Sequence, residues 1–165
     1  MAAPEMESLS IQLPEAAATQ ALAQRMAPLL AAGGVVWLQG ELGTGKTTFA
    51  RALLHALGVD ERVKSPTYSL VENYPLRAGN SAWHLDLYRI VAAGELDYLG
   101  LDALHEHDAL VLVEWPERGA SALPRADLLL CLSHADAART SRLVAHSARA
   151  QAWLQALARV TESER

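Results

Sequence analysis

The sequence contains a single cysteine, Cys131, and this scarcity excludes one large class of protein. A lone thiol cannot form a disulfide within the chain, so a small secreted fold held by disulfides is ruled out. Cys131 lies in the apolar run 128–132 and is interpreted as a small buried side chain. The missing disulfides suit a reducing compartment, and we expect a cytoplasmic protein.

Long apolar runs and an excess of basic residues are also missing. No stretch approaches the ~20 apolar residues that a membrane helix needs, and residues 1–8 lack the basic start and apolar centre of a signal peptide. Lysine and arginine total 14 against 19 aspartates and glutamates, so the formal net charge is −5. A chain that binds nucleic acid by itself usually has a basic face. This balance therefore disfavours direct RNA binding, and no membrane contact is expected.

What the chain does have is enough apolar residues for one core. Hydrophobic residues make up 51 % of its 165 positions, and this length leaves no room for two independent cores. We therefore expect a single domain over residues 1–165, with flexible ends at 1–9 and 161–165.

The spacing of apolar residues predicts the order of the elements. Helical spacing predicts three helices, at 14–32, 46–57 and 148–160. Apolar runs and alternating patterns predict six strands, at 35–38, 68–74, 82–90, 109–113, 126–133 and 142–147. Residues 94–107 are expected to be helical in pieces. This order predicts an α/β fold, a three-layer sandwich around a mixed, largely parallel central sheet.

One segment, GELGTGKT at 40–47, fits the pattern G-x-x-x-x-G-K-[ST] in full. Its glycines let successive N–H groups point at phosphate oxygens, together with the positive end of the following helix. Lys46 is expected to reach the β- and γ-phosphates, Thr47 to bind Mg²⁺, and Thr48 to touch the α-phosphate. Because an apolar strand precedes the segment and a helix follows it, we predict a P-loop NTPase fold. The remaining loop residues expected at the nucleotide are Leu42, Gly43, Thr44 and Gly45.

Two carboxylates and one threonine are candidates to complete the site. Glu114 ends an apolar strand, where the acid that holds Mg²⁺ is expected in P-loop proteins. Asp86 lies on the face of strand 82–90 opposite the leucines, and either a catalytic or a merely polar role is open for it. Thr67 follows Pro66 before a strand, where a switch threonine that senses the γ-phosphate can lie; a simple turn is the alternative.

Two other polar clusters have plainer interpretations. His105 and His107 lie two residues apart without a third ligand at suitable spacing, so they are interpreted as part of a solvated helix end. Glu95 and Asp97 are expected to decorate a helix surface.

Four segments together resemble the bacterial TsaE family (also called YjeE), the ATPase of tRNA threonylcarbamoyladenosine biosynthesis. They are GELGTGKTTF at 40–49, SPTY at 65–68, HLDLYR at 84–89 and EWPE at 114–117. The resemblance covers residues 10–147. The P-loop is widely shared among proteins, whereas the other three segments in combination are far more specific.

The resemblance implies a Mg²⁺-dependent ATPase subunit that acts with two partner proteins, TsaB and TsaD. Those partners transfer a threonylcarbamoyl group to adenosine 37 of tRNA, so tRNA is contacted only indirectly. Hydrolysis of ATP is expected to be weak for the chain alone and stimulated by the partners. The pattern N/T-K-x-D, which is typical of guanine recognition, is absent, which agrees with ATP as the nucleotide.

The resemblance also implies roles for particular residues. The catalytic or switch residues are Lys46, Asp86, Glu114 and Thr67, and the metal ligands are Thr47 and Glu114. Trp115 is implied beside the nucleotide, Thr19 near the base or ribose, and Arg139 at the site from a loop before the last strand.

Two other functions are compatible with a P-loop. A small-molecule kinase needs an arginine-rich lid, and only Arg118 and Arg125 lie between residues 92 and 126. A nucleotide-gated binding module would use ATP only to set its affinity for a partner. The ATPase subunit is the preferred hypothesis, followed by the gated module and then the kinase.

Overall fold

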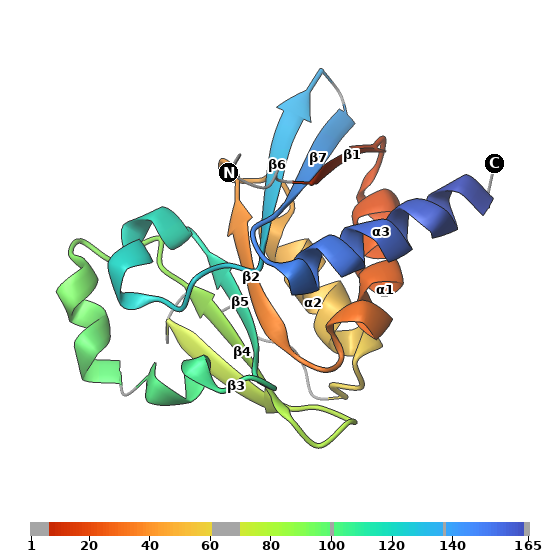
Figure 1. Ribbon diagram of the computed structural model, residues 1–165. Helices are drawn as coiled ribbons and strands as arrows, with labels where there is room; N and C mark the ends of the chain where they lie inside the picture. The colour runs from red at the N-terminus through yellow and green to blue at the C-terminus, as the bar shows by residue number, and fades with distance from the viewer. Residues whose placement is uncertain (1–6, 61–69, 100, 137, 164–165) are drawn as a thin grey trace, which may run out of the picture.

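The computed structural model describes residues 7–60, 70–99, 101–136 and 138–163, and within them one seven-stranded sheet forms the centre of the molecule (Figure 1). The strand order is β1-β7-β6-β2-β5-β4-β3. The strands are β1 (Ser8–Leu13), β2 (Gly34–Gln39), β3 (Val71–Pro75), β4 (Ser81–Asp86), β5 (Leu110–Glu114), β6 (Leu128–Ala135) and β7 (Ala138–Ala145). Strands β6, β2, β5 and β4 are parallel, whereas β1, β7 and β3 join antiparallel. The predicted mixed sheet is confirmed.

The two faces of the sheet are covered by different kinds of helix. The α-helices α1 (Ala16–Leu30), α2 (Lys46–Ala56) and α3 (Ala148–Ser163) pack on one face. The other face carries 3₁₀ segments, namely η1 (Ala93–Leu99), η2 (Leu101–His105), η3 (Pro116–Arg118) and η4 (Ala120–Ala122). The fold is therefore the predicted three-layer α/β sandwich, with short 3₁₀ turns as its third layer.

Strand β5 illustrates why the core has two halves. Leu110 and Leu112 join the cluster beneath the α-helices, and Val111 and Val113 join the cluster beneath the 3₁₀ turns. All five residues of β5 are buried. A parallel strand covered on both faces reads as one continuous apolar run, which is why the sequence pattern located it.

The first strand was not predicted from the sequence. Residues 8–13 of β1 pair antiparallel with β7, from Ser8 opposite Val144 to Leu13 opposite Arg139. Its pattern alternates serine and glutamine with apolar residues, and only Leu13 is fully buried. The strand depends on a partner more than 120 positions away in sequence, which local patterns do not report.

Several element boundaries differ from the predicted ones. Strand β4 ends at Asp86, and the N–H of Ile90 turns back to donate to the carbonyl of Leu87 at 3.0 Å. Pro28 lies inside α1 without ending it, and α3 continues three residues past its predicted end. The long hairpin of β6 and β7 replaces two shorter predicted strands, because each strand satisfies the other's backbone groups.

Candidate nucleotide-binding site

The P-loop connects the end of β2 to the start of α2, as the sequence predicts. Gly45 is the residue before the helix and has φ +106°, in the left-handed region where a side chain is strained. A Cβ at Gly45 would lie 3.2 Å from Nη1 of Arg139 and 3.6 Å from Cγ2 of Thr19. Gly40 also has a positive φ, of +155°, and a Cβ there would lie 2.5 Å from the carbonyl oxygen of Leu132. Both positions therefore require glycine.

A cavity of about 450 Å³ opens over this loop. It is bounded by the loop, the start of α2 and the ends of β4 and β5. The predicted site residues that line it are Leu42, Gly43, Gly45, Lys46, Thr47, Thr48, Asp86, Glu114, Trp115 and Arg139. The P-loop and the ends of β4 and β5 thus meet around one space, because the carboxyl ends of adjacent parallel strands share one edge of the sheet, and Arg139 joins them from β7.

Thr47 and Glu114 form a direct pair on one wall of the cavity. The Thr47 hydroxyl donates to Oε1 of Glu114 at 2.7 Å, and Glu114 is only 2 % exposed. A hydroxyl and a carboxylate supply the hard oxygen atoms that Mg²⁺ prefers. The donor set of this wall therefore fits a Mg²⁺ site with both residues as ligands.

Asp86 lies beside this pair at the end of the neighbouring strand. It is the register partner of Glu114 across β4 and β5, and its Oδ1 accepts the N–H of Tyr88 at 3.0 Å. Burial raises the pKa of the Asp86 carboxyl above its usual value, and the charge of Glu114 adds to the increase. The bond from Tyr88 opposes both effects. Asp86 is thus held at the cavity, on the side predicted for it.

Lys46 is turned back onto its own loop. Its Nζ donates to the carbonyl oxygens of Gly40 and Glu41, and it lies 3.8 Å from the ring centroid of Trp115. Burial lowers the pKa of Lys46, and the negative charges of Glu114, Glu117 and Asp86 oppose that change. The ammonium group is therefore satisfied within the protein by carbonyl oxygens and an aromatic face.

Trp115 holds this position with an unusual backbone. Its φ of +57° lies in the left-handed region, which is uncommon for a bulky residue and costs about 1–3 kcal/mol. The ring also packs against Tyr88, with 5.0 Å between centroids and 53° between planes. The strained turn after β5 thus places an aromatic ring over the P-loop lysine.

Three residues predicted to contact the nucleotide are not among the described residues that line the cavity. Thr19 is 0 % exposed and does not line the cavity, although its buried hydroxyl has no hydrogen-bond partner in the described part of the chain and its methyl group lies close to Gly45. Thr44 is 1 % exposed and its hydroxyl donates to the carbonyl oxygen of Glu41 at 2.8 Å. Thr67 lies outside the described residues.

The predicted loop around Arg139 is a strand. Arg139 is the second residue of β7, where it pairs with Leu13 on one side and His134 on the other. It still lines the cavity. The prediction of a loop was wrong because the hairpin is rich in polar residues, both exposed ones such as Ser133 and the buried Ser141, and so resembles a loop in composition.

His84 lies next to the site, although no role was predicted for it from the sequence. It is 0 % exposed, and its Nε2 lies 2.6 Å from Oε2 of Glu114. The alternation of residues in β4 could have indicated a place for His84 at the site, because it puts His84 and Asp86 on one face of the strand and Leu85 on the other. That face of the sheet is not solvent-exposed, because its other residues Ala82 and Leu112 belong to the core cluster that includes Phe49 of α2.

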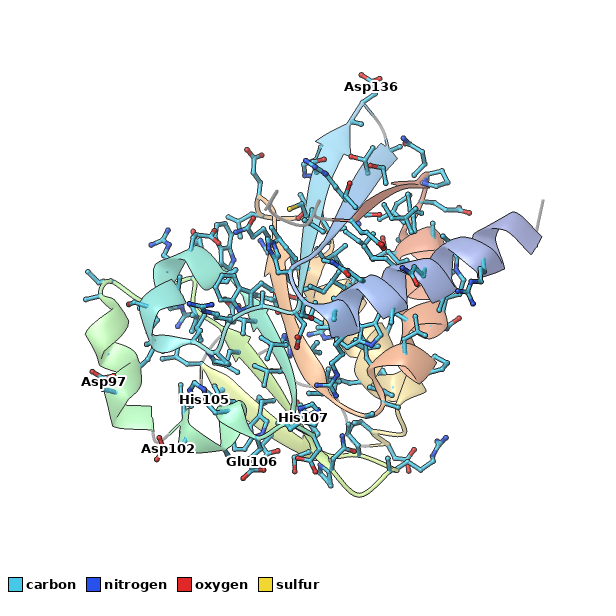
Figure 2. The ribbon with its side chains drawn as sticks, viewed as in Figure 1. Asp97, Asp102, His105, Glu106, His107 and Asp136 are labelled. Carbon is cyan, nitrogen blue, oxygen red and sulfur yellow. The ribbon has the colours of Figure 1, made fainter. Side chains whose placement is uncertain are left out.

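The histidines of the 3₁₀ layer lie in another part of the molecule. Figure 2 shows His105 and His107 near Asp102 and Glu106 along η2 and the turn after it. In the part of the chain that the structure describes, no group of three or more histidine, cysteine, aspartate or glutamate residues could hold a metal ion. No helix among the described residues is long and apolar enough to cross a membrane.

The fold and the loop together define a protein of the P-loop NTPase class. The family model described as "Threonylcarbamoyl adenosine biosynthesis protein TsaE" matches residues 13–143. The chain therefore belongs to the TsaE family.

Individual relatives agree with this assignment. The TsaE protein of Haemophilus influenzae, named a tRNA threonylcarbamoyladenosine biosynthesis protein, is 37 % identical over 147 residues, which are 86 % of this chain and 92 % of that protein. The TsaE protein of Streptomyces coelicolor is also 37 % identical, over 82 % of this chain and 93 % of its own. The crystal structure of YdiB from Bacillus subtilis superposes with a TM-score of 0.77 at 25 % identity, covering 96 % of this chain and 99 % of YdiB.

Proposed function

We propose that this chain is an ATP-binding and ATP-hydrolysing subunit required for threonylcarbamoyl modification of adenosine 37 in tRNA, acting with the partner proteins TsaB and TsaD. The observation that carries the proposal is the pairing of Thr47 with Glu114 at 2.7 Å on the wall of a cavity over the P-loop. Membership of a family named for threonylcarbamoyladenosine biosynthesis supports the pathway.

The residues of the cavity supply what phosphate transfer to water requires. Lys46 would leave its carbonyl partners and neutralise the β- and γ-phosphates, while the loop N–H groups bind phosphate oxygens. Thr47 and Glu114 would hold Mg²⁺, which when bound neutralises charge on the transferred phosphate. Asp86 would act beside the Mg²⁺ position as a catalytic or switch acid. Thr67 would be the switch threonine that senses the γ-phosphate.

Slow hydrolysis by the chain alone is part of the proposal. Among the described residues that line the cavity there is no glutamine to position an attacking water. A partner that completes the site would therefore accelerate the reaction. The net charge of −5 supports contact with tRNA through the partners only.

The test is ATP hydrolysis by the purified chain, alone and with purified TsaB and TsaD, beside the variant Lys46→Ala. We expect slow turnover alone, stimulation by the partner pair, and loss of both in the variant. Fast turnover by the chain alone, or slow turnover that the pair leaves unchanged, would overturn the proposal.

A nucleotide-gated binding module is the second candidate, and the position of Lys46 favours it. Because Lys46 is bound to carbonyl oxygens and to Trp115, nucleotide binding has to rearrange both residues. Such a rearrangement could alter partner affinity without hydrolysis. The discriminating variant is Glu114→Ala. If it still supports tRNA modification with the partners, gating is the function; if modification stops while ATP still binds, hydrolysis is required.

A further inference from the structure

A chain of hydrogen bonds extends from the proposed metal position into the core. The Thr47 hydroxyl bonds to Oε1 of Glu114 at 2.7 Å, and the other carboxylate oxygen, Oε2, lies 2.6 Å from Nε2 of His84. The three residues come from α2, β5 and β4. The two oxygens of one carboxylate thus have different partners, one at the cavity and one behind it.

The bond to His84 has a defined direction. An ionised carboxylate can only accept hydrogen bonds, so with Glu114 ionised the Nε2–H group of His84 is the donor and Oε2 is the acceptor. The other ring nitrogen, Nδ1, is buried and has no hydrogen-bond partner among the described residues. Within the described residues, the bond to Glu114 is therefore the only hydrogen bond of this ring.

His84 cannot reach the ligand itself. It is 0 % exposed and is not among the residues that line the cavity, whereas Glu114 is. Any influence of His84 on the site must therefore pass through Glu114. Leaving one oxygen of a buried carboxylate without a hydrogen bond would cost folding free energy. Without a second partner, rotation of the Glu114 carboxylate would also be less restricted.

We propose that His84 is a positioning residue that fixes the carboxylate of Glu114 so that Oε1 faces Thr47 and the Mg²⁺ position. The inference rests on the proposed function, because it assigns Glu114 to the metal. Residues behind a metal ligand orient it, and their loss typically weakens metal affinity by about 10- to 100-fold. The geometry of β4 and β5 explains the placement, since His84 and Glu114 lie on the same face of adjacent strands.

The experiment measures binding of a fluorescent ATP analogue as Mg²⁺ is titrated, and again in EDTA, so the readout does not depend on turnover. The variant His84→Leu removes the donor. We expect the Mg²⁺ concentration for half-maximal effect to rise about 10-fold or more. Binding in EDTA should stay within about twofold of wild type, because the loop and Lys46 are unchanged.

Two amide variants keep the test decisive if His84→Leu does not fold. Glutamine can place its amide N–H near the position of Nε2, whereas the shorter asparagine cannot. We expect His84→Gln to retain most of the Mg²⁺ response and His84→Asn to lose it, although both are polar. The control His55→Gln changes a histidine on α2 that bonds to the carbonyl of Val59 and should behave as wild type.

The outcomes separate the two proposals. An unchanged Mg²⁺ response in His84→Leu, equal responses in the two amide variants, or equal losses with Mg²⁺ and in EDTA would each overturn the positioning role while leaving the proposed function intact. If the wild-type chain binds no ATP analogue, or binds it without any effect of Mg²⁺, both proposals fail.

Discussion

Two neighbouring pairs of residues in the cavity, called here the proposed metal end and the lysine end, differ in how far they are prepared for a ligand. At one end, Thr47 and Glu114 already form the pair that a metal site requires, with His84 behind them. At the other end, Lys46 is bound to carbonyl oxygens of its own loop and lies under Trp115. Glu114 and His84 lie on adjacent core strands, whereas Lys46 is held by groups that a phosphate must displace. Because Lys46 and Thr47 are consecutive residues of α2, the difference between them comes from their partners and not from the element that carries them.

The largest effect is expected from breaking the lysine end. Lys46→Ala removes a charged donor to the phosphates, and hydrogen bonds to charged groups are worth about 1.5–3 kcal/mol. ATP affinity should therefore fall roughly 10- to 150-fold, as measured by calorimetric titration. Arg51→Ala, which removes one positive charge from an exposed position of α2, is the matched control. Equal losses in the two variants would mean that only overall charge matters.

The next largest effect tests the metal end. Thr47→Val keeps the shape of the side chain but removes the hydroxyl that bonds to Glu114. The Mg²⁺-dependent part of ATP affinity should fall about 10-fold, because one proposed ligand is lost, and binding in EDTA should change little. Thr47→Ser retains the hydroxyl and should keep the Mg²⁺ response. A serine variant as weak as the valine variant would count against a role for the hydroxyl.

A smaller effect reports on the contact between Lys46 and Trp115. A cation over an aromatic ring is worth about 0.5–2 kcal/mol, so its disruption by ATP should cost about 2- to 30-fold in affinity. The intrinsic tryptophan fluorescence should change when ATP is added and should not change in Trp115→Phe. Trp153→Phe, in the core packing of α3, should retain the change. A signal that persists without Trp115 would show that another tryptophan senses the nucleotide.

The smallest effect is expected from Glu95, which lies outside the cavity in the 3₁₀ layer. A change there should alter stability without altering ATP affinity, so it serves as a reference for the variants at the cavity. Oε2 of Glu95 accepts the N–H groups of Ala92 at 2.9 Å and Val91 at 2.8 Å, and these bonds lower the pKa of its carboxyl. A group whose pKa is lowered by folding stabilises the protein above its unfolded pKa, and this contribution is lost as the pH falls through the folded value.

The variant Glu95→Gln should therefore slightly lower Tm at neutral pH. The difference from wild type should begin to shrink as the pH falls to the usual glutamate pKa and should vanish only below the lower pKa that the folded protein gives this carboxyl. ATP affinity should not change. Asp97→Asn, at an exposed position of the same segment, controls for charge. A difference in Tm that persists in acid would indicate that the carboxylate is not the stabilising group.

Some features could be predicted because each depends on a short stretch of sequence. They are the P-loop, with Lys46 and Thr47 in it, and the location of β2 and β5. The loop needs glycines at fixed spacing, and a strand buried on both faces needs a continuous apolar run. The position of Glu114 beside the P-loop could be predicted from its place at the end of such a strand, and its role as a metal ligand stays a prediction. The four-segment resemblance correctly identified the family.

The partnerships between these residues were decided by the tertiary structure. The pairing of His84 with Glu114 requires β4 and β5 to be adjacent, and the strand β1 requires β7. The contact of Lys46 with Trp115 requires the turn after β5 to have a positive φ. Local sequence determines which groups are available and on which face of a strand they lie. Which buried group meets which depends on strand order, and strand order is set by contacts between residues far apart in the chain.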